Sequence, residues 1–258
     1  MGKVIVVANQ KGGVGKSTTS VNLSAYLGDL KKKVLVIDCD PQGNTTSGLG
    51  IDKSALETTV YDVLINEAKI KEAVIETKYK NLAVCPSDVD LAGAEIELVS
   101  VNQREYILKK AIEEVKQEYD YIFIDCPPSL GLLTLNAFAA ADSVIIPIQC
   151  EFYALEGLGQ LTNTITSLKK SINEALEIEG ILLTMFDKRT NLSGLVLDEV
   201  KKFFPDKVFK TVIPRNVRLS EAPSFGEPIL AYDKMSKGAF AYKALAKELI
   251  KKQPREEK

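Results

Sequence analysis

The sequence contains no histidine, which excludes histidine general bases, histidine metal ligands and Ser-His-Asp triads for this 258-residue chain. Its four cysteines are scattered without Cys-x-x-Cys spacing, which disfavours a metal or iron–sulfur centre. No apolar stretch approaches the ~20 residues that a membrane-spanning helix needs. The first residues also lack a charged-then-apolar signal sequence. We therefore expect a cytoplasmic protein that does not bind a membrane.

Arginine is scarce as well, and its distribution is uneven. Three of the five arginines, Arg189, Arg215 and Arg218, lie between residues 185 and 252. That segment has fourteen basic against eight acidic residues, a balance of +6, whereas residues 1–184 have seventeen against twenty-five, a balance of −8. Charge alone is consistent with solvated lysine faces on surface helices or with a contact surface for an anionic partner such as DNA.

Short apolar runs alternate with helical patterns along the chain. The runs that predict strands are residues 4–7, 34–37, 82–84, 121–124, 143–148, 178–183 and 208–212. The clearest helical patterns are residues 104–118, 155–172 and 194–203. This alternation predicts an α/β fold with a single doubly wound, mainly parallel sheet and helices on both faces. We expect one domain over residues 1–252 and a charged tail over residues 253–258.

A glycine-rich segment, Gln10–Thr18, lies between the first expected strand and a helical pattern. Its three glycines allow backbone N–H groups to approach phosphate oxygens without a Cβ in the way. Lys16 suits the β/γ-phosphates of a nucleotide and the Ser17 hydroxyl suits Mg²⁺. The segment therefore predicts a phosphate-binding loop. It departs from the standard pattern at Gln10, where glycine is expected, and it carries an additional lysine, Lys11.

Acidic residues follow two of the expected strands. The strand at 34–37 leads into Asp38 and Asp40, and the strand at 121–124 leads into Asp125 in the Walker B arrangement of four apolar residues and an acid. Carboxylates at the ends of strands beside a phosphate loop can orient water or hold the waters of Mg²⁺. The first segment alone also describes an ordinary turn, and the second alone is weak evidence because many buried strands end in aspartate. Their combination with the phosphate loop predicts a functional site at the carboxyl edge of the sheet.

Together, these motifs resemble those of the deviant-Walker ATPases, which include the partition ATPases, the MinD-type cell-division regulators and the nitrogenase iron protein. Three further segments, Leu91–Glu95, Tyr153–Gly157 and Pro214–Pro223, resemble the chromosomal ParA/Soj subgroup. The resemblance covers essentially the whole chain. It implies a P-loop ATPase of the deviant-Walker subgroup.

The resemblance also implies a role for each residue that matches a family motif. Those implied to bind ATP or ADP are Lys11, Gly12, Gly13, Val14, Gly15, Lys16, Ser17, Thr18, Pro214 and Asn216. Those implied to catalyse hydrolysis are Lys11, Lys16 and Asp40. The residues implied to support Mg²⁺ are Ser17, Asp38 and Asp125, and the implied DNA contacts are Arg189 and Arg218.

The additional lysine implies a dimer. By this resemblance, Lys11 would cross to the partner's phosphates and act as an arginine finger supplied in trans does. Hydrolysis would therefore require an ATP-bridged homodimer. Pairing two basic faces roughly doubles the phosphate contacts with DNA and so raises affinity strongly. The resemblance implies a nucleoid-associated switch for chromosome or plasmid partitioning. It would bind double-stranded DNA non-specifically on ATP and be reset when a ParB/Spo0J-type centromere-binding protein stimulates its slow hydrolysis.

Three other functions use a similar scaffold. A MinD-like ATPase that cycles on membranes needs a C-terminal amphipathic anchor, but we expect the amphipathic pattern at residues 239–252 to pack on the core. A small-molecule ligase would need neither DNA nor a lysine that crosses a dimer interface. A metalloprotein electron donor is disfavoured by the cysteine spacing.

Overall fold

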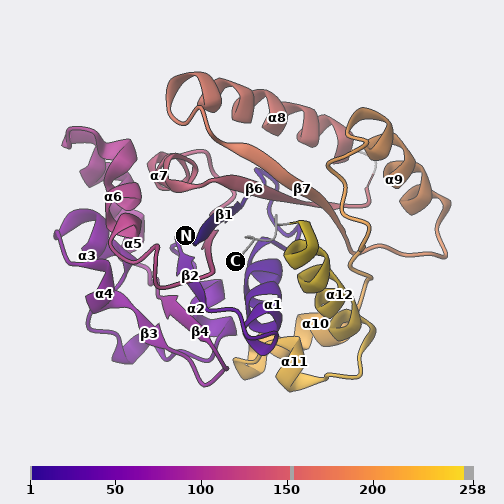
Figure 1. Cartoon of the computed structure of the whole chain (residues 1–258), viewed down its shortest axis with the longest axis horizontal. Coiled ribbons are helices and arrows are strands. Elements are labelled where there is room, and N and C mark those ends of the chain that lie inside the picture. The colour runs from indigo at the N-terminus through magenta and orange to yellow at the C-terminus, as the bar shows by residue number, and fades with distance from the viewer. Residues whose placement is uncertain (1, 152–153, 253–258) are drawn as a thin grey trace, which may run out of the picture.

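A seven-stranded sheet forms the centre of the computed structural model, which describes residues 2–151 and 154–252. The strand order is β3-β4-β2-β5-β1-β6-β7 (Figure 1). Neighbouring strands pair in parallel, except that the edge strand β3 pairs antiparallel with β4. The predicted doubly wound, mainly parallel fold is therefore confirmed. The strands are β1 (Lys3–Val7), β2 (Val34–Asp38), β3 (Ile75–Glu76), β4 (Leu82–Cys85), β5 (Tyr121–Asp125), β6 (Ser143–Gln149) and β7 (Glu177–Thr184).

Helices cover both faces of this sheet. Figure 1 shows α8 on one side of β6 and β7, with α1 and α12 on the other. The helices of the first face are α3 (Val60–Ile65), α4 (Ile70–Ala73), α5 (Leu91–Glu97), α6 (Ile107–Glu113), α7 (Leu132–Ala140), α8 (Ala154–Ser171) and α9 (Asn191–Phe203). Those of the second face are α1 (Lys16–Asp29), α2 (Asn44–Gly48), α10 (Val217–Glu221), α11 (Ile229–Tyr232) and α12 (Lys237–Lys252).

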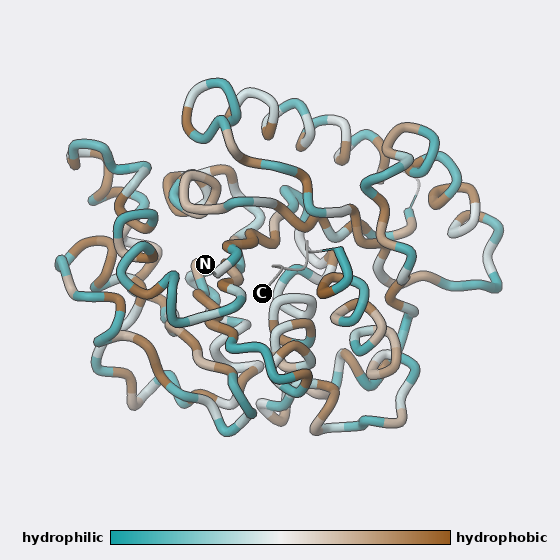
Figure 2. Tube along the Cα trace, viewed as in Figure 1, coloured by the Kyte–Doolittle hydropathy of each residue, from teal (hydrophilic) through white to brown (hydrophobic). Residues whose placement is uncertain are grey.

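Burial on both faces explains why the strands are continuous apolar runs. In β1, Val4 and Val6 pack into the core of the first face, whereas Ile5 and Val7 pack into the core of the second. Figure 2 shows apolar residues concentrated in these central strands. A parallel sheet covered by helices on both sides selects such runs in place of alternating polar residues.

The C-terminal helix α12 packs against α1, and Tyr242, Leu245 and Leu249 on it are buried. The expected packing of residues 239–252 on the core is therefore confirmed. Within residues 2–151 and 154–252, no helix is long and apolar enough to cross a membrane.

The expected strand at residues 208–212 is wrong. This segment runs beside β7, where Val208 makes an isolated bridge with Ile181, and Pro214 beyond it makes another with Phe186. The backbone N–H groups of Lys210 and Thr211 donate to the carboxylate of Glu248 on α12, at 2.7 and 2.9 Å, so they do not extend a ladder. The N–H groups of Phe209 and Ile213 still donate to carbonyls of β7, so Glu248 interrupts the ladder between them.

The expected helix at residues 104–118 is only partly formed. A single 3₁₀ turn at Arg104–Tyr106 leads into α6, which ends at Glu113. Residues 114–118 continue as turns, in which the N–H of Glu118 donates to the carbonyl of Val115 three residues earlier. The edge strand β3 and the short helices between β2 and α6 were not predicted.

Strand β7 carries an additional residue opposite β6. The pairing passes from Val144–Ile178 directly to Ile145–Gly180, so Glu179 lies in a bulge. The Glu179 carboxylate accepts a hydrogen bond from Ser143 at 2.7 Å. Gly180 then lies flat against the buried ring of Phe209, where a Cβ would overlap the ring.

We expect Gly180→Ala to lower the free energy of unfolding by about 1–3 kcal/mol, because the Phe209 ring would have to move out of a packed core. Urea denaturation measures this change. The matched control is Gly159→Ala on α8, where a Cβ meets open space and removal of a helical glycine should stabilise the protein by roughly 0.5–1 kcal/mol. Equal stability of the two variants would contradict the close packing of Gly180 on the Phe209 ring.

Candidate nucleotide-binding site

The loop between β1 and α1 is shaped to receive an anion. Gly13 and Gly15 have φ angles of 72° and 89°, which residues with a Cβ rarely adopt. The loop borders a cavity of about 600 Å³ that opens at the start of α1. Free N–H groups and the positive end of the helix dipole meet there, an arrangement that favours phosphate. Residues of the loop that line the cavity are Gly12, Gly13, Gly15, Lys16, Ser17 and Thr18.

The buried Val14 anchors this loop, since its carbonyl accepts a hydrogen bond from the Thr184 hydroxyl at 2.8 Å. The hydroxyl of Thr184 also reaches the carbonyl of Ile148, at 3.0 Å. The ends of β6 and β7 therefore hold the loop from behind.

The two lysines of the loop lie in different surroundings. Lys16 is buried, and its ammonium donates to the carbonyl of Lys11 at 3.3 Å. Burial lowers the pKa of Lys16, and the nearby carboxylates of Asp125 and Asp40 oppose that shift. The side chain of Lys11 is half-exposed and forms an ion pair with Glu151. Lys11 is not among the described residues that line the cavity.

Asp38 and Asp125 lie side by side at the ends of β2 and β5 and are fully buried. Asp38 accepts two hydrogen bonds from Thr46, from the backbone N–H at 2.8 Å and from the hydroxyl at 2.7 Å. It also accepts one from the N–H of Asp40 at 3.2 Å. Burial, together with the charge of the neighbouring carboxylate, raises the pKa of Asp38. Both of its oxygens are occupied by donors of the segment that follows β2.

Asp125 is surrounded by hydroxyl groups. It accepts hydrogen bonds from Ser20 on α1 at 3.0 Å and from Thr45 on α2 at 2.8 Å. Burial raises the pKa of Asp125, and hydrogen bonding from Ser17, Thr45 and Ser20 opposes that shift. The Ser17 hydroxyl therefore lies both beside this carboxylate and on the cavity wall.

The oxygen atoms of Ser17 and Asp125 are of the kind that Mg²⁺ prefers. Among the described residues, no cluster of three or more acidic, cysteine or histidine side chains could hold a metal by itself. A Mg²⁺ ion at this position would therefore complete its coordination with phosphate oxygens and water, which is the usual arrangement in phosphoryl-transfer sites.

Asp40 lies beyond Asp38 and lines the cavity. Its carboxylate accepts from the N–H of Gln42 at 2.9 Å, and its carbonyl accepts from the hydroxyl of Ser87 at 2.8 Å. Gly43, with a φ of 58°, completes the tight turn that leads into α2. Asp40 is thus held at the cavity wall by a turn that the sequence predicts from its proline and glycine.

A second cavity of about 520 Å³ adjoins the first and shares Gly15 and Thr18 with it. Pro214 and Asn216, the residues expected to hold adenine, line this second cavity together with Tyr242. Asn216 accepts from the N–H of Arg218 at 2.9 Å and so begins α10. The structure thus brings the expected base-binding residues next to the phosphate loop.

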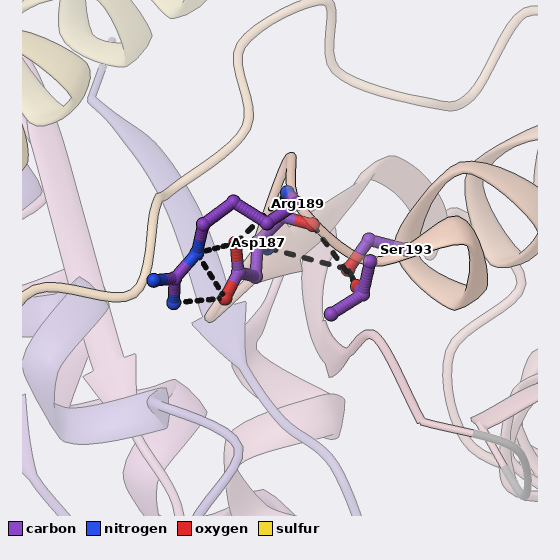
Figure 3. A network of polar contacts seen from close by, with 4 residues as sticks. Asp187, Arg189 and Ser193 are labelled. Atoms are coloured by element: carbon purple, nitrogen blue, oxygen red, sulfur yellow. Dashed lines mark hydrogen bonds and ion pairs between the residues drawn. The ribbon is translucent and has the colours of Figure 1, made fainter.

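The two arginines expected to contact DNA lie outside both cavities. Arg189 is largely exposed, and its Nε and Nη2 donate to the Asp187 carboxylate at 3.0 and 2.7 Å (Figure 3). This pairing lowers the pKa of Asp187 to about 2. The backbone N–H of Asp187 donates to Ser193 at 3.2 Å, which fastens the loop to α9. Arg218 lies on α10 and pairs with Glu221 at 2.9 Å.

Several residues of the site were missed by the sequence reasoning. Ser20, Thr45 and Thr46 supply the hydroxyls around the buried carboxylates, and Glu151 pairs with Lys11. The two threonines directly follow the turn at Asp38–Asn44, and this position is the only local signal of their role as donors to the buried carboxylates. Tyr153 of the family-like segment Tyr153–Gly157 lies outside the described residues, as does the tail at 253–258.

Comparisons with known proteins agree with this geometry. Residues 2–178 match a family model described as an AAA domain. The chain is 61% identical to the sporulation initiation inhibitor protein Soj of Bacillus subtilis, over 96% of this chain and 98% of that protein. It is 54% identical to the chromosome partitioning protein ParA of Myxococcus xanthus, over 98% and 89% of the two chains.

The solved structures include one titled cobyrinic acid a,c-diamide synthase from Mycobacterium smegmatis, with bound ADP and magnesium. It is 39% identical to this chain, and its TM-score is 0.85 over 97% of this chain and 95% of that one.

Thr46→Val tests the support of the buried carboxylates. It removes the hydroxyl that donates to Asp38 and accepts from the N–H of Ser87, so we expect a loss of about 1.5–3 kcal/mol in the free energy of unfolding. Urea denaturation gives the value. Thr166→Val on α8, whose exposed hydroxyl bonds only its own helix, is the control and should change stability by about 0.5 kcal/mol or less. A Thr46 variant as stable as this control would contradict a stabilising role for the hydrogen bonds that the Thr46 hydroxyl makes with Asp38 and Ser87.

Proposed function

Because the chain belongs to the Soj/ParA family of chromosome-partitioning ATPases, we propose that it is an ATP-dependent switch that dimerises on ATP and loads non-specifically on double-stranded DNA. Hydrolysis, stimulated by DNA and a ParB-type partner, would reset it. The proposal includes one ATPase domain over residues 1–252 and an association with the nucleoid. It rests on the two adjoining cavities, on the arrangement of the two lysines, and on the identity to Soj and ParA over nearly the full length.

We propose that ATP lies across the two cavities, with its phosphates at the glycine loop and its base between Pro214 and Asn216. The similar structure with ADP and magnesium supports this placement. Ser17 and Asp125 would hold Mg²⁺ and its waters, and Asp38 would support them through Thr46 and Asp40. When bound, the ion neutralises charge that develops on the phosphate oxygens.

The position of Lys11 is the observation that carries the dimer proposal. Its backbone carbonyl holds the ammonium of Lys16, while its own ammonium lies on the surface against Glu151. Lys16 therefore serves the phosphates of its own subunit. A half-exposed lysine directly before the cavity-lining Gly12 is placed to reach the phosphates of a second subunit, where a cation supplied in trans completes charge neutralisation.

Asp40 is suited to position the attacking water. It lines the cavity, and its turn is fastened by Gln42 and Ser87. The same turn leads into α2, whose Thr45 and Thr46 bond Asp125 and Asp38. Loss of the γ-phosphate would therefore change a segment that is connected to both buried carboxylates, which is how we propose that hydrolysis is communicated.

A small-molecule ligase is the second candidate, because the similar Mycobacterium smegmatis structure is that of a cobyrinic acid a,c-diamide synthase. The higher identity to Soj and ParA, over nearly the full length, favours partitioning. A ligase would also have no need for the exposed Lys11 or for DNA. DNA binding that depends on ATP separates the two functions.

Lys11→Ala and Lys16→Ala should have different effects. We expect Lys11→Ala to retain ATP binding but to lose about 10³-fold in hydrolysis, in the range of a cation supplied in trans. Lys16→Ala should weaken ATP binding itself by about tenfold or more, because a buried cation beside the phosphates is lost. Calorimetric titration and phosphate release measure the two effects. Hydrolysis by Lys11→Ala at the wild-type rate would contradict the dimer mechanism.

Arg189→Ala should weaken binding to non-specific DNA in the presence of ATP. Each phosphate contact contributes about 0.9 to the magnitude of the slope of log K against log salt concentration. For a dimer that loses two contacts, the magnitude of this slope should fall by about 1.8. Arg104→Ala is the control, since Arg104 pairs with Glu105 in the turn that leads into α6, at the end of the molecule away from α9 (Figure 1). Binding that is the same with ATP and ADP, or an unchanged slope, would count against the proposed DNA surface.

A further inference from the structure

The loop between β7 and α9 contains an acidic and a basic side chain that bind each other. Asp187 accepts hydrogen bonds from Nε and Nη2 of Arg189, and a third from the backbone N–H of Arg189 at 3.0 Å (Figure 3). The side chain of Arg189 is 87% exposed, whereas that of Asp187 is 20% exposed. The guanidinium therefore meets solvent while the carboxylate that binds it is largely covered.

This carboxylate occupies the part of the guanidinium that suits a phosphate. The Nε and Nη2 groups of an arginine form a planar fork that binds two oxygens of a carboxylate or of a phosphate in the same way. Both groups of Arg189 donate to Asp187. An anion from outside can bind this fork only if the carboxylate leaves it. Asp187 is therefore a resident anion on a residue that is expected to contact DNA.

The loop holds Asp187 in place through its backbone. The N–H of Asp187 donates to the Ser193 hydroxyl at 3.2 Å. Its carbonyl accepts from the N–H of Thr190 at 3.1 Å and from the Thr190 hydroxyl at 3.0 Å. Because the loop is fastened in this way, the effective concentration of the carboxylate at Arg189 is high, and any free anion has to compete with it.

A second arginine lies beside the same carboxylate. Pro214 forms a parallel bridge with Phe186, and the N–H of Arg215 donates to the carbonyl of Phe186 at 3.1 Å. Asp187 and Arg215 are the next residues of these two paired segments. Hydrogen bonds from Arg189 lower the pKa of Asp187, and the positive charge of Arg215 adds to this shift. Arg215 is exposed, and the proposed hydrolysis mechanism gives its side chain no role.

An acidic side chain at this position opposes DNA even after it has been displaced. Asp187 is only two residues from Arg189, so its charge would stay close to any phosphate that binds the guanidinium. Each subunit would then bind DNA more weakly than its arginines alone would allow. Retention on DNA would depend more strongly on two subunits acting together.

We propose that Arg189 and Arg215 form one phosphate-binding site, which Asp187 occupies in the free protein and which a phosphate of the DNA backbone takes over on binding. Asp187 is then an autoinhibitory contact that lowers the affinity of each subunit for DNA. This inference rests on the proposed DNA-binding function and adds Asp187 and Arg215 to it.

Asp187→Asn tests the resident carboxylate. The amide oxygen can still accept from the N–H of Arg189 and keep the turn, but the charge is lost. We expect the affinity for a labelled non-specific duplex, at saturating Mg-ATP, to rise about tenfold. Removal of an exposed ion pair contributes roughly threefold in each subunit, and the two subunits multiply. Fluorescence anisotropy at several salt concentrations measures the affinity.

Asp206→Asn is the matched control, because it removes the same charge from an exposed residue beyond the far end of α9. The length of the helix places it roughly 20 Å from the loop, which is more than a Debye length at physiological salt. Its affinity for the duplex should stay within about twofold of the wild type. An equal gain in the two variants would reveal a general effect of net charge and would overturn the role of Asp187.

Arg215→Ala tests the second arginine of the site. The magnitude of the slope of log K against log salt concentration should fall by about 1.8 for the dimer, as for the loss of one phosphate contact in each subunit. Arg215→Lys should restore most of the slope, since it keeps the charge. Saturating Mg-ATP is needed because Arg215 also borders the second cavity. A slope unchanged in Arg215→Ala would remove this residue from the site.

The wild type separates this inference from the proposed function. A wild type that does not bind the duplex with Mg-ATP would refute the proposed function, and this inference with it. If the wild type binds but Asp187→Asn binds equally well, Asp187 does not compete with DNA. If Asp187→Asn binds more weakly, the carboxylate positions Arg189 for DNA. Either of these two results refutes this inference and leaves the proposed function standing.

Discussion

The site depends on two carboxylates, Asp38 and Asp125, that lie side by side without solvent at the ends of paired strands. Two adjacent buried charges are expensive to hold unless hydrogen bonds and cations surround them. The structure supplies hydroxyls from α1 and α2 and the buried ammonium of Lys16. The positions of the phosphate loop, of α2 and of the turn at Asp40 all follow from this requirement.

This requirement also explains why the loops after β2 and β5 are fastened to each other and to α5. Donors for a buried carboxylate must be held at hydrogen-bonding distance, and flexible segments cannot do so. Thr46 bonds Asp38 and Ser87, and Glu95 holds the far end of the loop after β5. The loops after β2 and β5 are thus joined to α5 by a few polar contacts.

The fold and the core of the site could be predicted because their signals are local. Apolar runs mark strands that are buried on both faces, and the spacing of glycines, lysines and Ser17 describes one loop. The contacts of Thr46, Glu95 and Glu151 could not be predicted, because each joins segments that are distant in the sequence. The same reason explains the wrong strand at 208–212, where Glu248 takes the backbone donors. The roles of the nucleotide-site residues, like those of Arg189 and Arg218 on DNA, stay predictions.

Residues from opposite ends of the chain form the walls of the second cavity. Gly15 and Thr18 come from the first loop, whereas Pro214, Asn216 and Tyr242 come from the last segment and from α12, which packs against α1. During synthesis, the phosphate loop leaves the ribosome long before Pro214, Asn216 and Tyr242, which form the cavity wall proposed to hold the base. Tight nucleotide binding would then begin only after α12 has emerged from the ribosome. Binding of the nucleotide would therefore follow synthesis of the whole domain.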